Sequence, residues 1–205
     1  MESVVDRILG LEWMMFDMVQ GISGRSPCQD DEKTFLITRR SHFAILPEAV
    51  QQSYLEDLLE ADARGHNLLT EKYAYMMEFA SPEEFEKIKD YLPAVPDEKR
   101  LVVRDIVRCH LAQYEEVCKR YPHVASSGRP ATADRDGEET VSIETYMTGE
   151  LYTYSMRTLL LYTSFMEDAK TSGINVPMRM LEKQAFQQGF SSLDAFDTFL
   201  GSTSL

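Results

Sequence analysis

Apolar residues recur every three or four positions along most of the chain, which is the spacing of one face of an α-helix. The longest such pattern covers 142–168. Its stripe consists of Ile143, Met147, Leu151, Tyr154, Thr158, Leu161, Tyr162 and Phe165. One carboxylate, Glu150, falls inside this stripe, with Tyr146 one turn before it and Tyr154 one turn after it. Because an unpaired buried charge is costly, we expect Glu150 to be paired or to take part in chemistry.

Capping and breaking residues divide the rest of the chain into further helices. Ser26 and Gln29 form a capping box around Pro27, which predicts that a helix begins there. The stretch 67–80 is apolar nearly all round, so it and 142–168 are expected at the centre. The expected helices cover about 2–20, 26–46, 48–64, 67–80, 82–93, 97–121, 142–168, 175–189 and 191–200. No strand pattern remains, so the sequence predicts an all-α fold: a single compact helical domain over 1–205, with eight or nine helices and no sheet.

The segment 122–139 differs from the helices around it. It is polar, contains Pro and Gly, and is longer than an ordinary connection between helices. We expect a mobile surface loop there, serving either as a lid or only as a linker.

Charge and composition exclude several classes of function. The 205-residue chain has a net charge of -13, which disfavours binding to duplex nucleic acid or to an anionic membrane surface. No run of about 18 apolar residues could span a membrane, and the acidic N-terminus does not resemble a signal peptide. The three cysteines, Cys28, Cys109 and Cys118, show no close pairing motif. Reduced thiols in an acidic cytoplasmic protein are therefore expected.

Several segments resemble an uncharacterised bacterial family, the domain-of-unknown-function family numbered 4125. They are EWMMFDMV, CQDDEKTFLITRR, LLTEKYAYMMEF, ETYMTGELYTYS and the tail GFSSLDAF. The resemblance spans nearly the whole chain and implies a bacterial, intracellular, single-domain protein. It implies no activity and provides no catalytic residues.

Charged or titratable groups on apolar faces are the main candidates for a site. They are Glu12, Arg39, Lys72, His110 and Glu150, with Glu71 and Glu78 as a second tier. A guanidinium and a carboxylate match in a two-pronged fork, so Arg39 is expected to pair with Glu150 or Glu12. Such a pair could simply fix helix register. Several such residues in one small domain instead favour a polar pocket.

Cys28 is a candidate nucleophile because a helix N-terminus lowers the pKa of a thiol. The acidic residues that follow it oppose this effect, and a base such as His110 or His42 would have to lie close by. An ordinary core cysteine is the favoured alternative. Most tyrosines, including those of 142–168, are expected to pack, although Tyr146 and Tyr154 would also suit a ligand pocket.

No established metal or nucleotide motif is present. The chain lacks the Glu-x-x-His pairs of di-metal bundles, zinc-ligand spacing and a phosphate loop. An oxygen-rich site made by Glu12, Glu71, Glu78, Glu144 and Glu150 stays open only as a minor alternative, and no cofactor is indicated.

Two functions are compatible with the sequence. The first is a pocket for a small polar or anionic molecule, in which Arg39, Lys72, Glu12, Glu78, Tyr146 and Tyr154 bind the ligand. Glu150, Cys28 and His110 would carry any catalysis, and whether the protein is an enzyme is left open. The second is an interaction or structural domain whose buried charges are ion pairs. An apolar face on the last two helices could support a homodimer.

Overall fold

The computed structural model describes residues 2–21, 24–137 and 140–203, and these contain eleven α-helices and no named strand. The helices are α1 (Val4–Asp17), α2 (Glu32–Phe43), α3 (Glu48–Ala63), α4 (Leu68–Ala80), α5 (Pro82–Ile88), α6 (Asp97–Arg120), α7 (Pro122–Ser127), α8 (Ile143–Thr153), α9 (Met156–Thr171), α10 (Val176–Gln187) and α11 (Leu193–Thr203). Short 3-10 turns cover Pro27–Asp30, Lys89–Tyr91 and Ala133–Arg135. The predicted all-α fold is confirmed, with more helices than the expected eight or nine.

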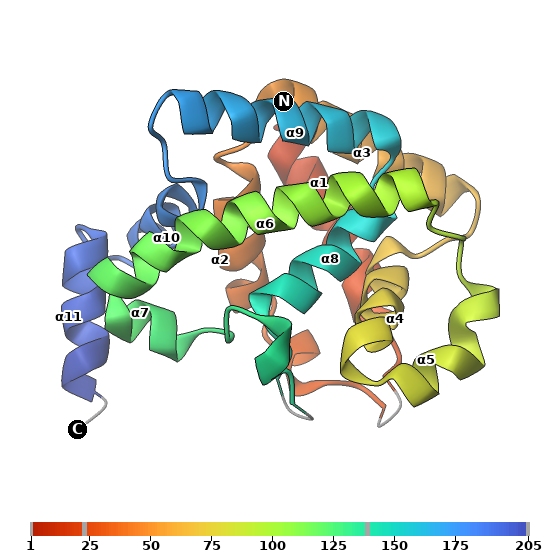
Figure 1. The fold of residues 1–205 in the computed structure, drawn as a ribbon, viewed down its shortest axis with the longest axis horizontal. Helices are drawn as coiled ribbons and strands as arrows, with labels where there is room; N and C mark the ends of the chain where they lie inside the picture. Colours follow the sequence, from red (N-terminus) through yellow and green to blue (C-terminus); the bar gives the residue numbers. More distant parts are fainter. Residues whose placement is uncertain (1, 22–23, 138–139, 204–205) are drawn as a thin grey trace.

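The long helix α6 crosses the molecule from α7 and α11 at one end to α4 and α5 at the other (Figure 1). One large hydrophobic core lies on one side of it and draws on α1, α3, α4, α8 and α9. A smaller cluster near the C-terminal end of α6 joins it to α7, α10 and α11, with Val117, Ala185 and Leu193 buried. The apolar stripe of α6 takes part in both cores, which explains its length.

Helices α4 and α8 pack against each other at very short range. At Gly149 in α8, an added Cβ atom would lie 2.8 Å from the backbone oxygen of Lys72 and 2.6 Å from Cγ of Met76. A side chain of any kind would therefore separate the two helices. This close approach brings the polar residues of α4 and α8 to the same part of the core.

The expected single helix over 142–168 is wrong, because the chain bends at Tyr154 and Ser155. Tyr154 adopts an extended backbone with ψ 146°, and Ser155 begins α9 as its N-cap by accepting a hydrogen bond from the backbone N–H of Thr158. The backbone N–H of Ser155 in turn donates to Asp57 of α3 at 3.0 Å. This contact with α3 satisfies a donor that the helix break leaves open.

The segment 122–139, expected to be a loop, contains α7 and a 3-10 turn, while 138–139 lie outside the described residues. Asp136 accepts from the backbone N–H of Ser142 at 2.6 Å, and Glu144 accepts from that of Ala133 at 2.8 Å. These bonds fasten the segment to the start of α8.

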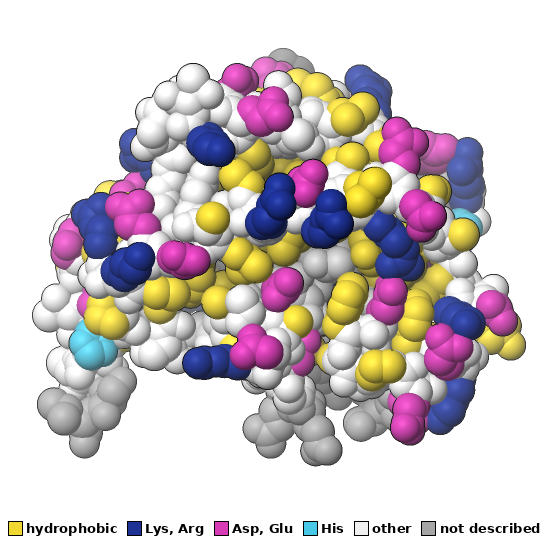
Figure 2. Space-filling model, viewed as in Figure 1, with side chains coloured by type: hydrophobic (Ala, Val, Ile, Leu, Met, Phe, Trp, Pro, Cys, Tyr) yellow, Lys and Arg dark blue, Asp and Glu magenta, His cyan; other side chains and the backbone are white. Residues whose placement is uncertain are grey.

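Lys and Arg side chains gather over α6 on the face shown in Figure 2. Beneath them, a groove of about 590 Å³ between α6 and α8 is lined by Leu101, Val107 and Leu111 together with Arg100 and Arg104. Within the part of the chain that the structure describes, we find no helix with the length and apolar character needed to cross a membrane.

Candidate functional site

The predicted pairing of Arg39 is confirmed, and it involves both candidate carboxylates at once. The Arg39 guanidinium donates from Nε to Glu12 Oε2 at 2.7 Å and from Nη2 to Glu12 Oε1 at 2.5 Å. It also donates from Nη1 and Nη2 to the two oxygens of Glu150, each at 3.0 Å. The three side chains are at most 8% exposed. Arg39 of α2 thus bridges α1 and α8 through two bidentate ion pairs.

Lys72 and two tyrosines complete this buried charge network. Lys72 Nζ donates to Glu150 Oε2 at 2.6 Å, and its side chain is only 2% exposed. The Tyr54 hydroxyl donates to Glu12 at 2.8 Å, and the Tyr154 hydroxyl donates to Glu150 at 3.1 Å. Two cations balance two carboxylates, and each of the four carboxylate oxygens accepts at least one hydrogen bond.

Burial and neighbouring charges shift the pKa values of Arg39 and Glu150 in opposite directions. Burial alone would raise the pKa of Glu150, but the charges of Arg39 and Lys72 outweigh it and hold that pKa well below its usual range. Burial alone would lower the pKa of Arg39, yet Glu12 and Glu150 raise it well above its usual value. Glu150 therefore stays ionised near neutral pH, which favours a positioning role over proton transfer.

A cavity of about 330 Å³ lies beside this network, between α2, α6, α8 and α10. We call it the histidine cavity, lined by Thr38, Arg39, His42, His110, Tyr114, Val124, Gly128, Arg129, Ile143, Tyr146, Met147, Glu150, Leu151, Tyr162, Met180, Leu181 and Gln184. Arg39, Glu150, Tyr146 and His110 of the predicted site share its wall. Glu12, Lys72 and Tyr154 do not line it.

Two histidines stand out on this wall. Among the described residues, His42 Nε2 and His110 Nδ1 are the two buried side-chain nitrogen or oxygen atoms without a hydrogen-bond partner. His42 Nε2 lies 3.9 Å from Glu150 Oε1, which is too long for a hydrogen bond. Since such an atom destabilises a fold by about 1–3 kcal/mol, two of them at one cavity call for an explanation.

Both imidazoles are neutral at physiological pH. Burial lowers the pKa of His42 to about 3. The nearby cations Arg39 and Lys72 also lower this pKa, whereas Glu150 raises it. Burial lowers the pKa of His110 to about 4. Each ring therefore carries one N–H donor and one acceptor nitrogen.

Arg129 lies where the segment after α7 covers the cavity. Its Nη1 donates to the backbone oxygen of Val141 at 3.0 Å, and its guanidinium carbon lies 4.6 Å from the centre of the Tyr146 ring. Lys72 Nζ lies 3.6 Å from the centre of the same ring. No carboxylate of the described chain forms an ion pair with Arg129.

The prediction that Cys28 occupies the first turn of an α-helix and the inner face is wrong. Cys28 is exposed in the 3-10 turn Pro27–Asp30. The helix α2 begins only at Glu32, where Asp31 accepts from the backbone N–H of Thr34. The capping box acts on the short turn, so Cys28 gains no long helix dipole.

Glu78 is not part of the network either, contrary to the expected pocket. It pairs with Arg100 of α6 at 2.9 Å and lies partly exposed. Arg100 also donates to the Tyr152 hydroxyl at 3.1 Å. The pair therefore joins α4 to α6 at the surface.

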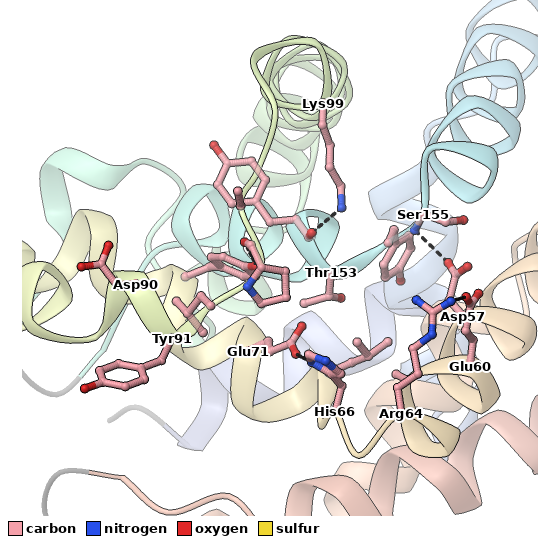
Figure 3. A pocket seen from close by; sticks show the side chains of 18 residues that line it. Asp57, Glu60, Arg64, His66, Glu71, Asp90, Tyr91, Lys99, Thr153 and Ser155 are labelled. Atoms are coloured by element: carbon pink, nitrogen blue, oxygen red, sulfur yellow. Dashed lines mark hydrogen bonds and ion pairs between the residues drawn. The ribbon is translucent and has the colours of Figure 1, made fainter.

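Glu71 faces a separate open groove of about 550 Å³, shown in Figure 3. There it contacts His66 at 2.7 Å, while Asp57 accepts from Ser155 and Glu60 pairs with Arg64. Tyr91 points away from these groups. The three carboxylates already hold partners, so this groove is a weaker candidate than the histidine cavity.

Sequence reasoning missed part of the site. Tyr54 and Arg129 were not singled out, and His42 was considered only as a base for Cys28. The apolar spacing around His42 and His110 is the signal from which both could have been recognised as candidates for one site. Among the described residues, no group of three or more His, Cys, Asp or Glu side chains is placed to hold a metal ion.

Because both histidines are neutral in the folded protein, we expect it to lose stability in mild acid. Their pKa values in the folded protein, about 3 and about 4, lie below the ordinary 6.5. The unfolded chain therefore binds protons first as pH falls, so this stability is complete above pH 6.5 and declines below it. We expect a slope of up to about 1.4 kcal/mol per pH unit for each histidine.

Denaturant unfolding of wild type and of the double variant His42→Asn/His110→Asn, measured from pH 7.5 to pH 5, tests this prediction. The decline in unfolding free energy should be shallower in the double variant. Parallel declines in the two proteins would contradict the neutral state of the histidines.

Comparison with known proteins identifies the family. The sequence profile of the family described as "Protein of unknown function (DUF4125)" matches residues 2–198. No curated protein and no solved structure matches the chain. Since the profile covers nearly the whole sequence, the chain belongs to the family of proteins of unknown function DUF4125.

Proposed function

We propose that this protein binds a small organic molecule in the histidine cavity. The observation that carries the proposal is the pair of imidazoles, His42 and His110, which line one cavity and make no side-chain hydrogen bond within the described protein. A ligand with a polar group would hydrogen-bond to these neutral rings, which find no hydrogen-bond partner within the described protein. The volume of about 330 Å³ falls at the lower end of the range for ligand pockets.

The buried charge network has a different role in this proposal. Each of its charged groups already pairs with an opposite charge within the protein, so the structural explanation of buried ion pairs suits Glu12, Arg39 and Lys72. Glu150 belongs to both parts because it pairs with Arg39 and also lines the cavity. The network therefore holds α2 and α8 in place, and these helices provide the cavity wall.

Binding without covalent catalysis suits this lining best. The nucleophile candidate Cys28 is not among the residues around the cavity, and Glu150 stays ionised in its ion pairs. Besides the Arg39–Glu150 ion pair and Arg129, the wall presents neutral hydrogen-bonding groups and apolar side chains from α8 and α10. This combination is typical of pockets that recognise a small molecule.

A thermal-shift screen of small metabolites with a cavity-filling variant tests the proposal. Met180 lines the cavity from α10 and is only partly buried, so Met180→Trp should fill the space without breaking the core. Compounds that raise the melting temperature of wild type should fail to do so with Met180→Trp. The matched control is Leu160→Trp on the exposed side of α9, which should leave those shifts unchanged.

Two results would count against a ligand site in the cavity. One is the absence of any stabilising compound across the screen. The other is a set of stabilising compounds whose shifts survive Met180→Trp.

A further inference from the structure

The charges around the histidine cavity determine which ligand it can accept. Inside the network, Glu12 and Glu150 balance Arg39 and Lys72, and both histidines are neutral. Of the residues that line the cavity, Arg129 adds a positive charge that no carboxylate of the described chain neutralises. The described residues around the cavity therefore carry one net positive charge, in a chain whose total charge is -13.

Aromatic rings surround the space that this charge faces. Tyr114, Tyr146 and Tyr162 line the cavity with the two imidazoles. The His42 and Tyr162 rings lie nearly parallel, at 22° with centroids 6.4 Å apart. Burial raises the pKa of Tyr114 to about 12, so this phenol stays neutral. Flat aromatic walls favour a planar ring as the body of the ligand.

From these observations, and resting on the proposed function, the geometry points to a planar aromatic monoacid as the ligand. Its carboxylate pairs with Arg129, which offers a planar guanidinium suited to two-pronged recognition. Its ring lies among the tyrosines. A hydroxyl or N–H group on the ring forms hydrogen bonds with the imidazoles of His42 and His110 that line the cavity.

A series of small probes separates these features. The molecules 4-hydroxyphenylacetate, 4-hydroxyphenylacetamide and tyramine share one ring and carry an anionic, a neutral and a cationic group. Phenylacetate lacks the hydroxyl. Calorimetric titration of the full chain should give the tightest binding for 4-hydroxyphenylacetate, weaker binding for the amide and for phenylacetate, and the weakest for tyramine.

Two protein variants assign the preferences to residues. Arg129→Gln should weaken the binding of the acid about tenfold or more and that of the amide less than about threefold, because a charged hydrogen bond contributes more than a neutral one. His110→Phe should abolish the preference for 4-hydroxyphenylacetate over phenylacetate. Arg129 is partly exposed and in no ion pair of the described chain, so its variant remains informative if His110→Phe does not fold.

The outcomes separate this inference from the proposed function. The monoacid assignment is overturned by equal affinity for acid and amide, by tighter binding of tyramine, or by the absence of calorimetrically detectable binding of any probe. An acid preference that survives Arg129→Gln overturns the role of Arg129. The proposed function is decided separately by the Met180→Trp comparison, which does not depend on these probes.

Discussion

Replacing Arg39 with Leu should destabilise this protein more than any other single change to a charged residue. The substitution leaves Glu12 and Glu150 buried beside each other, and Glu12 keeps only the Tyr54 hydroxyl as a partner. Removing one member of a buried ion pair typically lowers unfolding free energy by about 3–5 kcal/mol. Guanidinium chloride unfolding at pH 7 measures the loss.

A matched control is available at the surface. Arg100 forms an ion pair with Glu78, but its side chain is 36% exposed, so Arg100→Leu should lower unfolding free energy by less than about 1 kcal/mol. Similar losses for Arg39→Leu and Arg100→Leu would show that burial does not strengthen the Arg39 contacts.

The Arg39 variant should also show an unusual response to pH. Without the guanidinium, two buried carboxylates share the single cation Lys72, so burial and mutual repulsion favour the uptake of one proton by the folded variant. The folded variant then binds more protons than its unfolded state, so its deficit relative to wild type should shrink from pH 7 to pH 5. An unchanged deficit over this range would contradict the mechanism.

The second large effect is expected at Gly149, the point of closest approach between α4 and α8. In Gly149→Ala the new Cβ atom would lie 2.8 Å from the Lys72 backbone oxygen, which cannot rotate away as a side chain can. Overpacking of this kind lowers unfolding free energy by about 1–3 kcal/mol. Thermal and denaturant unfolding should both record the loss.

The same substitution at Gly10 should raise the free energy of unfolding instead of lowering it. Gly10 lies on the exposed side of α1, and an added Cβ atom there would meet nothing within 4 Å. Since Ala is the better helix former, Gly10→Ala should raise unfolding free energy by about 0.5–1 kcal/mol. If both variants are stabilised, the α4–α8 contact is looser than the geometry indicates.

The sequence predicts the buried network well because electrostatics leaves few alternatives. Arg39, Lys72 and Glu150 fall on apolar stripes, and charges in such positions must meet one another or a ligand. The expectation that 67–80 and 142–168 lie at the centre follows from the same stripes. Helix α6 was also placed within one residue of its observed end, because Pro96 and Pro122 mark its limits.

Other features depend on contacts that sequence spacing does not reveal. The bend at Tyr154 is fixed by Asp57 of α3, and nothing in the local sequence excludes a continuous helix through Ser155. Glu78 shares the helical face of Glu71, yet the two carboxylates pair with Arg100 and His66 in different places. The histidine cavity arises where α2, α6, α8 and α10 fail to fill space, which is a property of packing rather than of any motif.

The wide sequence separation within the buried charge network has a consequence for synthesis on the ribosome. Glu12 and Arg39 are 27 residues apart and can meet early, but Lys72 precedes Glu150 by 78 residues. At typical translation rates of about 5–20 residues per second, this separation corresponds to a delay of roughly 4–16 s. During that delay the nascent chain exposes the apolar surface of α4 and its lysine, since α8 does not yet exist to cover them. Translation thus sets the order in which the core closes, with α8 as the last part of the network to arrive.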